Sequence, residues 1–387
     1  MIKKNILVID DSALMRRHIS DIINSDNRFE VKDLATNGLE GLDLIVKNRL
    51  HYDAVILDIN MPKMNGLELL LQLQKNHIQL TVIMVSTLTK EGAKETILAL
   101  ERGAFDFVTK PENYLDAKDV SFKNRLLDML VVATNAKVIS PTADNTIKAP
   151  VNKKPDASEQ GIRSEDNGDY VAVNKRMQFK PHKKMSGTKE GKRKLIALAC
   201  STGGPKSLQS VIPKLPKNLD APLVLVQHMP AGFTKSLAQR LDDISQVNVK
   251  EAADGDILKK GWVYVAPGGK QTKIVKEGQS YRIAILDDPA RDGLKPCANI
   301  MYESLIGSRY DEITCVVLTG MGADGTNGIG MLGENNNIHV ISQNAETCVV
   351  YGMPKAIAEA GITDEVLPLE DIAQAITKNV GVLNDGR

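Results

Sequence analysis

Aromatic residues are scarce in this sequence: they make up 4% of its 387 residues and include a single tryptophan. Proteins that bind single-stranded nucleic acid stack bases on aromatic side chains, so that class is disfavoured. The four cysteines stand singly, with no CxxC pair and no histidine at zinc-finger spacing, which indicates reduced thiols in a cytoplasmic protein. No apolar run approaches the roughly 20 residues that a membrane span requires, and no signal peptide opens the chain. We therefore expect a cytoplasmic protein without membrane insertion.

Net charge is also small, with 49 basic against 48 acidic residues. The length predicts two or three domains at about 100–200 residues each. Composition changes at residue 140: residues 140–192 hold 11 basic residues, 7 acidic residues and four prolines without a periodic apolar pattern. Such a segment cannot bury a core, so we interpret it as a flexible basic linker between domains at 1–139 and 193–387. The two flanking segments carry net charges of −1 and −2, which argues against a DNA-binding output domain.

Residues 1–139 alternate apolar β-branched runs with amphipathic stretches. Uninterrupted runs of this kind are typical of strands buried on both faces, hence of a parallel sheet. Five βα units predict a flavodoxin-like, doubly wound five-stranded parallel sheet. The expected strands are 6–9, 31–35, 54–57, 81–85 and 105–108, and the expected helices are 13–25, 38–48, 67–76, 91–102 and 119–136.

Residues 193–387 show a second, longer alternation of the same kind, which predicts a larger Rossmann-like α/β domain with a mostly parallel sheet. The expected strands are 195–200, 223–227, 262–266, 282–286, 314–319 and 339–343. The expected helices are 205–212, 233–241, 296–307, 325–332, 354–360 and 369–379.

Charged side chains stand at strand ends in the first domain. Asp10 and Asp11 follow the first strand, Asp58 the third and Lys110 the fifth. Ligands of an open parallel sheet bind beyond the carboxyl ends of its strands, so these groups are expected to converge. Three neighbouring carboxylates call for a divalent cation, and oxygen ligands suit Mg²⁺. Asp58 can then accept a phosphoryl group, with the Lys110 ammonium and the Ser86 hydroxyl beside it. The alternative is a set of solvated loop acids.

Four segments carry a resemblance to the receiver domain of two-component systems: 8–12 (VIDDS), 56–66 (ILDINMPKMNG), 84–86 (MVS) and 108–111 (VTKP). The resemblance implies phosphotransfer from a histidine kinase to Asp58. It also implies Mg²⁺ bound by Asp11, Asp58 and the main-chain carbonyl of Asn60, with Asp10, Ser86 and Lys110 in support.

A candidate nucleophile opens the second domain. Ser201 directly follows the strand at 195–200, and Thr202-Gly203-Gly204-Pro205 leads into a helix. A serine between a strand end and a helix start is exposed, and free N–H groups nearby can receive an oxyanion. The alternative is a serine that only caps the helix.

Of the six histidines, only His228 and His339 lie in this domain, and His228 follows the carboxyl end of its strand. His339 begins its strand and is interpreted as structural. Asp324, in the segment 320–325, is the candidate that orients the imidazole of His228, with N–H groups near Met321, Thr202 and Gly203 serving the oxyanion. The same segment matches GxGxxG of dinucleotide-binding proteins, but the next strand ends in Gln343 rather than in an acid.

Five segments together resemble the effector domain of chemotaxis protein-glutamate methylesterases: 201–205 (STGGP), 227–234 (QHMPAGFT), 265–268 (VAPG), 318–325 (LTGMGADG) and 352–354 (GMP). The family commonly has Gly-Ala where this chain has Ala199-Cys200, and Arg-Pro-Ser where it has Lys295-Pro296-Cys297. The resemblance implies a monomeric, phosphorylation-activated hydrolase that needs no cofactor for ester hydrolysis. It would demethylate methyl-accepting chemotaxis receptors, deamidate selected receptor glutamines and receive phosphate from the chemotaxis histidine kinase. The alternative is a response regulator whose second domain binds nucleic acid or a partner without catalysis.

Overall fold

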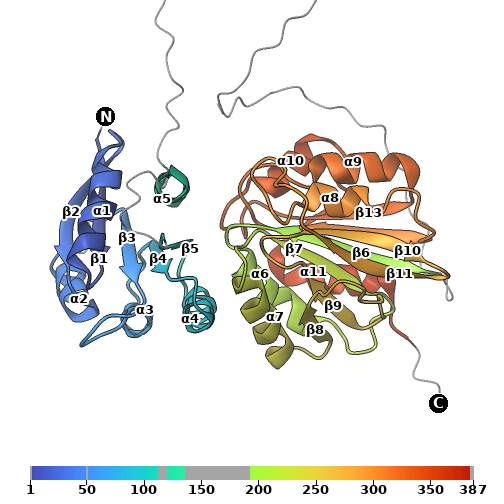
Figure 1. Ribbon diagram of the computed structural model, residues 1–387, viewed down its shortest axis with the longest axis horizontal. Helices are drawn as coiled ribbons and strands as arrows, with labels where there is room; N and C mark the ends of the chain where they lie inside the picture. Colours follow the sequence, from blue (N-terminus) through green and yellow to red (C-terminus); the bar gives the residue numbers. More distant parts are fainter. Residues whose placement is uncertain (1, 49–50, 112–119, 136–191, 384–387) are drawn as a thin grey trace, which may run out of the picture.

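The computed structural model describes residues 2–48, 51–111, 120–135 and 192–383, which form two α/β units (Figure 1). The predicted linker at 140–192 lies outside the described residues, apart from Lys192. Within the described part of the chain, no helix combines the length and the apolar character needed to cross a bilayer.

The first unit contains one parallel sheet of five strands, as predicted, and the structure gives the strand order β2-β1-β3-β4-β5. Buried residues cover both faces of this sheet, which explains the unbroken apolar runs. The strands are β1 (Lys4–Ile9), β2 (Phe29–Ala35), β3 (Ala54–Asp58), β4 (Val82–Ser86) and β5 (Asp106–Thr109). The helices are α1 (Ala13–Asn24), α2 (Gly38–Lys47), α3 (Gly66–Lys75), α4 (Lys90–Glu101) and α5 (Val120–Thr134).

Short polar side chains begin most of these helices. The hydroxyl of Ser12 accepts a hydrogen bond from the N–H of Met15 and so caps α1 directly beyond the acidic end of β1. Asn65 and Glu68 form a reciprocal capping box at the start of α3. Because these caps start α1 and α3 soon after β1 and β3 end, the loops between them are short. The acidic side chains that follow β1 and end β3 therefore stay at the edge of the sheet.

The second unit has a seven-stranded parallel sheet in the order β14-β13-β12-β6-β7-β9-β8. The predicted strand at 282–286 belongs instead to a separate antiparallel hairpin of β10 and β11. The edge strands β8 and β14, of four and three residues, were not predicted. The strands are β6 (Lys194–Cys200), β7 (Leu223–Gln227), β8 (Asn248–Glu251), β9 (Trp262–Val265), β10 (Gln271–Glu277), β11 (Ser280–Leu286), β12 (Glu312–Val317), β13 (Ile338–Gln343) and β14 (Glu365–Leu367).

Helices cover both faces of this sheet (Figure 1). Two apolar clusters separate them, one beneath α8, α9 and α10 and the other beneath α6, α7 and α11. The helices are α6 (Gly204–Val211), α7 (Phe233–Ile244), α8 (Ala298–Glu303), α9 (Thr326–Asn335), α10 (Met353–Glu359) and α11 (Leu369–Val380).

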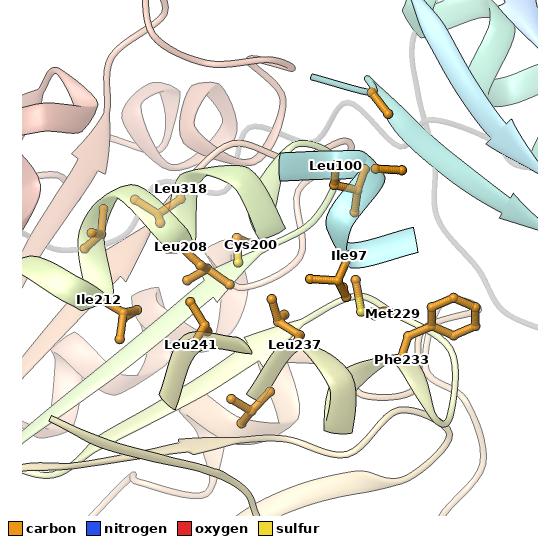
Figure 2. Packing of buried hydrophobic residues seen from close by; sticks show 14 of the residues in the cluster. Ile97, Leu100, Cys200, Leu208, Ile212, Met229, Phe233, Leu237, Leu241 and Leu318 are labelled. Atoms are coloured by element: carbon orange, nitrogen blue, oxygen red, sulfur yellow. The ribbon is translucent and has the colours of Figure 1, made fainter. Parts of the chain in front are cut away.

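The apolar cluster beneath α6 and α7 continues into the first unit. Ile97 and Leu100 of α4 are buried in the same cluster as Leu237 of α7 and Met229 of the loop before it (Figure 2). At the rim of this contact, the carboxylate of Glu101 accepts two hydrogen bonds from the guanidinium of Arg240, at 2.6 and 3.1 Å. The β5 and α4 edge of the first unit therefore docks on the second unit.

Candidate functional site

The predicted acidic pocket forms at the carboxyl edge of the first sheet. Carboxylate oxygens of Asp10, Asp11 and Asp58 all lie within 4.8 Å of one another. Lys110 Nζ lies 2.9 Å from a carboxylate oxygen of Asp10 and 2.9 Å from one of Asp58. Ser86 is buried beside them, and its hydroxyl contacts the hydroxyl of Thr96 at 2.7 Å. The donor set is made of oxygen atoms at short mutual distances, which fits the preference of Mg²⁺.

Asp58 is buried at the end of β3, and its carboxyl group is electrostatically unusual. Burial raises its pKa to about 6, an effect that Lys110 opposes and the charge of Asp10 reinforces. A bound cation would favour the carboxylate form that can act as a nucleophile. The side chain of Asn60 points its amide at Glu95, with 2.9 Å between Nδ2 and Oε2. The expectation that the Asn60 main-chain carbonyl binds the metal remains a prediction.

Ser201 directly follows the last residue of β6, in the short loop that leads into α6. Its N–H donates to the carbonyl of Thr319 at 3.0 Å, which ties the nucleophile candidate to the loop after β12. Gly203 has a φ of 77°, and a Cβ at that position would lie 2.5 Å from the Cβ of Val349. Only glycine fits this tight turn, so the turn holds Ser201 at the start of the helix.

His228 and Asp324 meet as the sequence predicts. The N–H of His228 donates to the carbonyl of Cys200 at 3.1 Å, which continues the pairing of β6 and β7 and brings His228 beside Ser201. His228 Nε2 lies 2.8 Å from Asp324 Oδ2. This contact leaves Nδ1 as the ring nitrogen that can act as a base. No hydrogen bond joins the side chains of Ser201 and His228 within the described residues, although both line one cavity of about 510 Å³.

The carboxylate of Asp324 is held by the start of α8. It accepts hydrogen bonds from the N–H groups of Ala298 at 2.6 Å and Asn299 at 2.9 Å, and from Cys297 Sγ at 3.3 Å. Burial by itself would raise the pKa of Asp324, but the hydrogen bond and charge of His228 and these N–H groups outweigh it and lower the pKa. The carboxylate therefore stays ionised and can stabilise an imidazolium at His228.

Candidate oxyanion donors surround Ser201. The N–H of Ser201 itself is used by Thr319, whereas those of Thr202, Gly203 and Met321 have no acceptor among the described residues. Main-chain N–H groups that are free and fixed in place are suited to bind a developing oxyanion. Which of them does so stays a prediction.

Two residues of the first unit that the sequence did not mark as functional lie in the same cavity. Asp106 and Phe107 of β5 line it together with Ser201 and His228. Burial raises the pKa of the Asp106 carboxyl to about 7, although the Phe107 N–H and the Thr202 side chain act to lower it. An acid inside an otherwise apolar strand was the one sequence signal for this role, because such a group needs a polar partner when buried.

The first unit carries an acidic pocket with a lysine at the carboxyl edge of its sheet. It docks on an α/β domain that brings a serine and a hydrogen-bonded His-Asp pair to one edge. This combination is typical of a response regulator with a hydrolase output domain. Residues 196–376 match the family described as CheB methylesterase, and residues 6–118 match the response regulator receiver domain.

Known proteins resemble nearly the whole chain. A protein-glutamate methylesterase/protein-glutamine glutaminase of Geobacillus kaustophilus is 39% identical over 376 residues, covering 97% of this chain and 98% of the relative. A protein of the same description from Bacillus subtilis is 40% identical over 378 residues, covering 97% and 98%. The crystal structure of the Thermotoga maritima CheB methylesterase catalytic domain is 41% identical, covers 48% of this chain and 97% of that chain, and aligns with a TM-score of 0.46.

The chain belongs to the protein-glutamate methylesterase/protein-glutamine glutaminase family. It is therefore a chemotaxis response regulator whose output domain is a hydrolase, and the alternatives of a non-catalytic output domain and of a nucleotide-binding enzyme are not favoured.

Proposed function

We propose that phosphorylation of Asp58 releases the receiver domain from an esterase site built on Ser201, His228 and Asp324. The observation that carries this proposal is that Asp106 and Phe107 of the receiver line the same cavity as Ser201 and His228. In this proposal the receiver residues that line the cavity restrict the access of a bulky protein substrate to Ser201. Asp58 ends β3, two strands away from the docked strand β5. A phosphoryl group on Asp58 changes the charge beside Lys110, the residue that directly follows β5.

The reaction begins when His228 Nδ1 takes the proton from Ser201 Oγ as the oxygen attacks the carbonyl carbon of a glutamate γ-methyl ester. The tetrahedral oxyanion is received by main-chain N–H groups of Thr202, Gly203 or Met321. The C–O bond to the methoxy group then breaks, and the imidazolium returns its proton to that oxygen, releasing methanol. Water, deprotonated by His228, hydrolyses the acyl-enzyme to glutamate and restores Ser201. With a glutamine side chain the leaving group is ammonia.

In the receiver, Asp11, Asp58 and the main-chain carbonyl of Asn60 would hold Mg²⁺, which supplies positive charge to offset that of the incoming phosphoryl group. Lys110 and Ser86 contact the same group from the ends of β5 and β4. No cofactor takes part in the proposed ester hydrolysis, because a serine, a base and an orienting acid suffice for acyl transfer.

The proposed substrates are methylated glutamates on the cytoplasmic helices of chemoreceptors, and the proposed phosphodonor is the chemotaxis histidine kinase. The activity then belongs in the cytoplasm, and a monomer suffices because both domains of one chain supply the switch and the site.

Methanol release from methylated receptor membranes tests the nucleophile. Ser201→Ala should lose activity by at least about a thousandfold, as removal of a triad nucleophile does. Ser210→Ala is the matched control, because Ser210 lies on α6 a few residues further on and its hydroxyl donates to the carbonyl of Lys206. Wild-type methanol release by Ser201→Ala would rule out the assignment.

A further inference from the structure

A buried glutamine links the nucleophile candidate to the base candidate. Gln227 is the last residue of β7, and its side chain is buried. Its amide nitrogen Nε2 donates to the main-chain carbonyl of Ser201 at 3.0 Å and to that of His228 at 3.1 Å. One amide group thus uses both of its N–H bonds on the two residues whose relative position decides proton transfer.

The oxygen of this amide also accepts a hydrogen bond. Cys200 Sγ lies 3.0 Å from Gln227 Oε1, so the thiol donates to the amide oxygen. The reversed amide orientation would place Oε1 against two carbonyl oxygens and Nε2 against a thiol, which is a poor acceptor. The contacts therefore define a single orientation of the side chain.

Space around the amide is as restricted as its hydrogen bonding. A Cβ at Gly204 would lie 2.1 Å from Gln227 Oε1 and 3.0 Å from Cys200 Sγ. The start of α6 therefore lies directly against the amide, and the helix could not approach so closely with any larger residue.

We propose that Gln227 is a positioning residue of the esterase site, which holds Ser201 and His228 at a fixed separation through their carbonyls, and that the Cys200 thiol orients it. The inference rests on the proposed function, since it takes Ser201 as the nucleophile. Cys200 itself is fully buried, and burial raises the pKa of its thiol far above the usual range, so it does not compete as a nucleophile. Its contribution to the site is the hydrogen bond to Gln227.

The test replaces Gln227 by methionine, which has a similar length but no N–H donor. Without this donor the carbonyls of Ser201 and His228 lose their common hydrogen-bond partner, so the two residues can move apart. A displacement on the order of 1 Å in such a site lowers the rate by about 100-fold. For Gln227→Met we expect kcat to fall about 10- to 100-fold and KM to stay within about twofold, in full-length protein with a small phosphodonor and methylated receptor membranes. Assays run well below the melting temperature of each variant, so that the folded fraction is the same.

Gln209→Met is the matched control. Gln209 lies on α6, and its amide nitrogen is buried without a hydrogen-bond partner in the described part of the chain. The same substitution there should leave kcat near the wild-type value. A merely structural role of Gln227 predicts unchanged kcat in the folded fraction, and kcat within twofold of wild type in Gln227→Met overturns the proposal.

Substitutions at Cys200 give a second test, with a smaller expected effect, that can be carried out even if Gln227→Met does not fold. Cys200→Ala should lower kcat about two- to fivefold, Cys200→Ser should restore it, and Cys200→Ala should add nothing to Gln227→Met, because both act through one amide. A wild-type kcat for Cys200→Ala, or additive losses in the double variant, contradicts the inference. Ser201→Ala separates the two levels: if it retains activity the proposed function fails, and if it is inactive while Gln227→Met is fully active only the positioning role fails.

Discussion

The stacked rings of Phe107 and Phe233 make the strength of domain docking measurable. Their centroids lie 4.6 Å apart with an interplanar angle of 26°, and they join β5 of the receiver to the start of α7. Phe233 is buried, whereas Phe107 is half-buried. Removal of the Phe107 ring therefore weakens docking more than it weakens either domain core.

The expected size follows from the area and the ring contact. Full burial of a phenylalanine side chain stabilises by about 1.5–3 kcal/mol, and an aromatic pair adds about 0.5–1.5 kcal/mol. Because Phe107 is only half-buried, Phe107→Ala should cost the docked arrangement about 1.3–3 kcal/mol, which shifts the docking equilibrium about 10- to 150-fold. Phe107→Leu keeps apolar contact but loses the ring pair, so its effect should be about half as large.

The assay is methanol release from methylated receptor membranes without a phosphodonor. Phe107→Ala should raise this basal rate by up to the factor above, with the rate of phosphorylated wild type as the ceiling. Phe29→Leu is the matched control, because Phe29 lies on β2 at the opposite edge of the receiver sheet. An unchanged or lowered basal rate in Phe107→Ala, with the phosphorylated rate intact, would refute the reasoning that docking restrains the site.

Three further predictions concern titratable groups and their partners. Burial raises the pKa of Asp106 from 3.8 to about 7. Protonated Asp106 therefore favours docking at low pH, and this contribution to docking is lost as the pH rises through about 7. Basal methanol release should rise over the same pH range, relative to Asp106→Asn. Burial raises the pKa of Asp58 to about 6, so protons compete with Mg²⁺ below that pH, and the affinity measured by titration calorimetry should fall by up to about tenfold per pH unit, a step that Asp58→Asn removes. Cys297→Ala removes one donor to Asp324, which strengthens the attraction of this carboxylate for protonated His228. The acidic limb of the profile of kcat/KM against pH should therefore move to higher pH, whereas Cys297→Ser should keep the wild-type profile and an unchanged limb in Cys297→Ala would count against the contact.

The receiver fold and its pocket were predictable because each element of the pocket follows its strand directly in the sequence. Asp10, Asp58 and Lys110 need only the rule that the carboxyl ends of parallel strands share one edge. The same rule brought His228 beside Ser201, since β6 and β7 are neighbours in the sheet. Strand-end chemistry is thus a local property that a sequence displays.

What the sequence did not reveal depends on contacts between distant segments. The strands β8 and β14 are too short to show a period, and β11 pairs with β10 rather than with the main sheet. In the sequence, Phe107 is an ordinary aromatic residue of a strand, and only the structure shows its ring stacked on that of Phe233. Gln227 is likewise a routine strand end in the sequence, and only the structure shows its amide between two carbonyls.

The central claim is that one phosphoryl group on Asp58 controls ester hydrolysis at Ser201. The most direct measurement is methanol release from methylated receptor membranes, with and without a small phosphodonor, by full-length wild type and by Asp58→Asn. The account predicts that the phosphodonor with Mg²⁺ accelerates wild type and leaves Asp58→Asn at the basal rate, while Ser201→Ala releases no methanol in either condition. Equal acceleration of wild type and Asp58→Asn would contradict it.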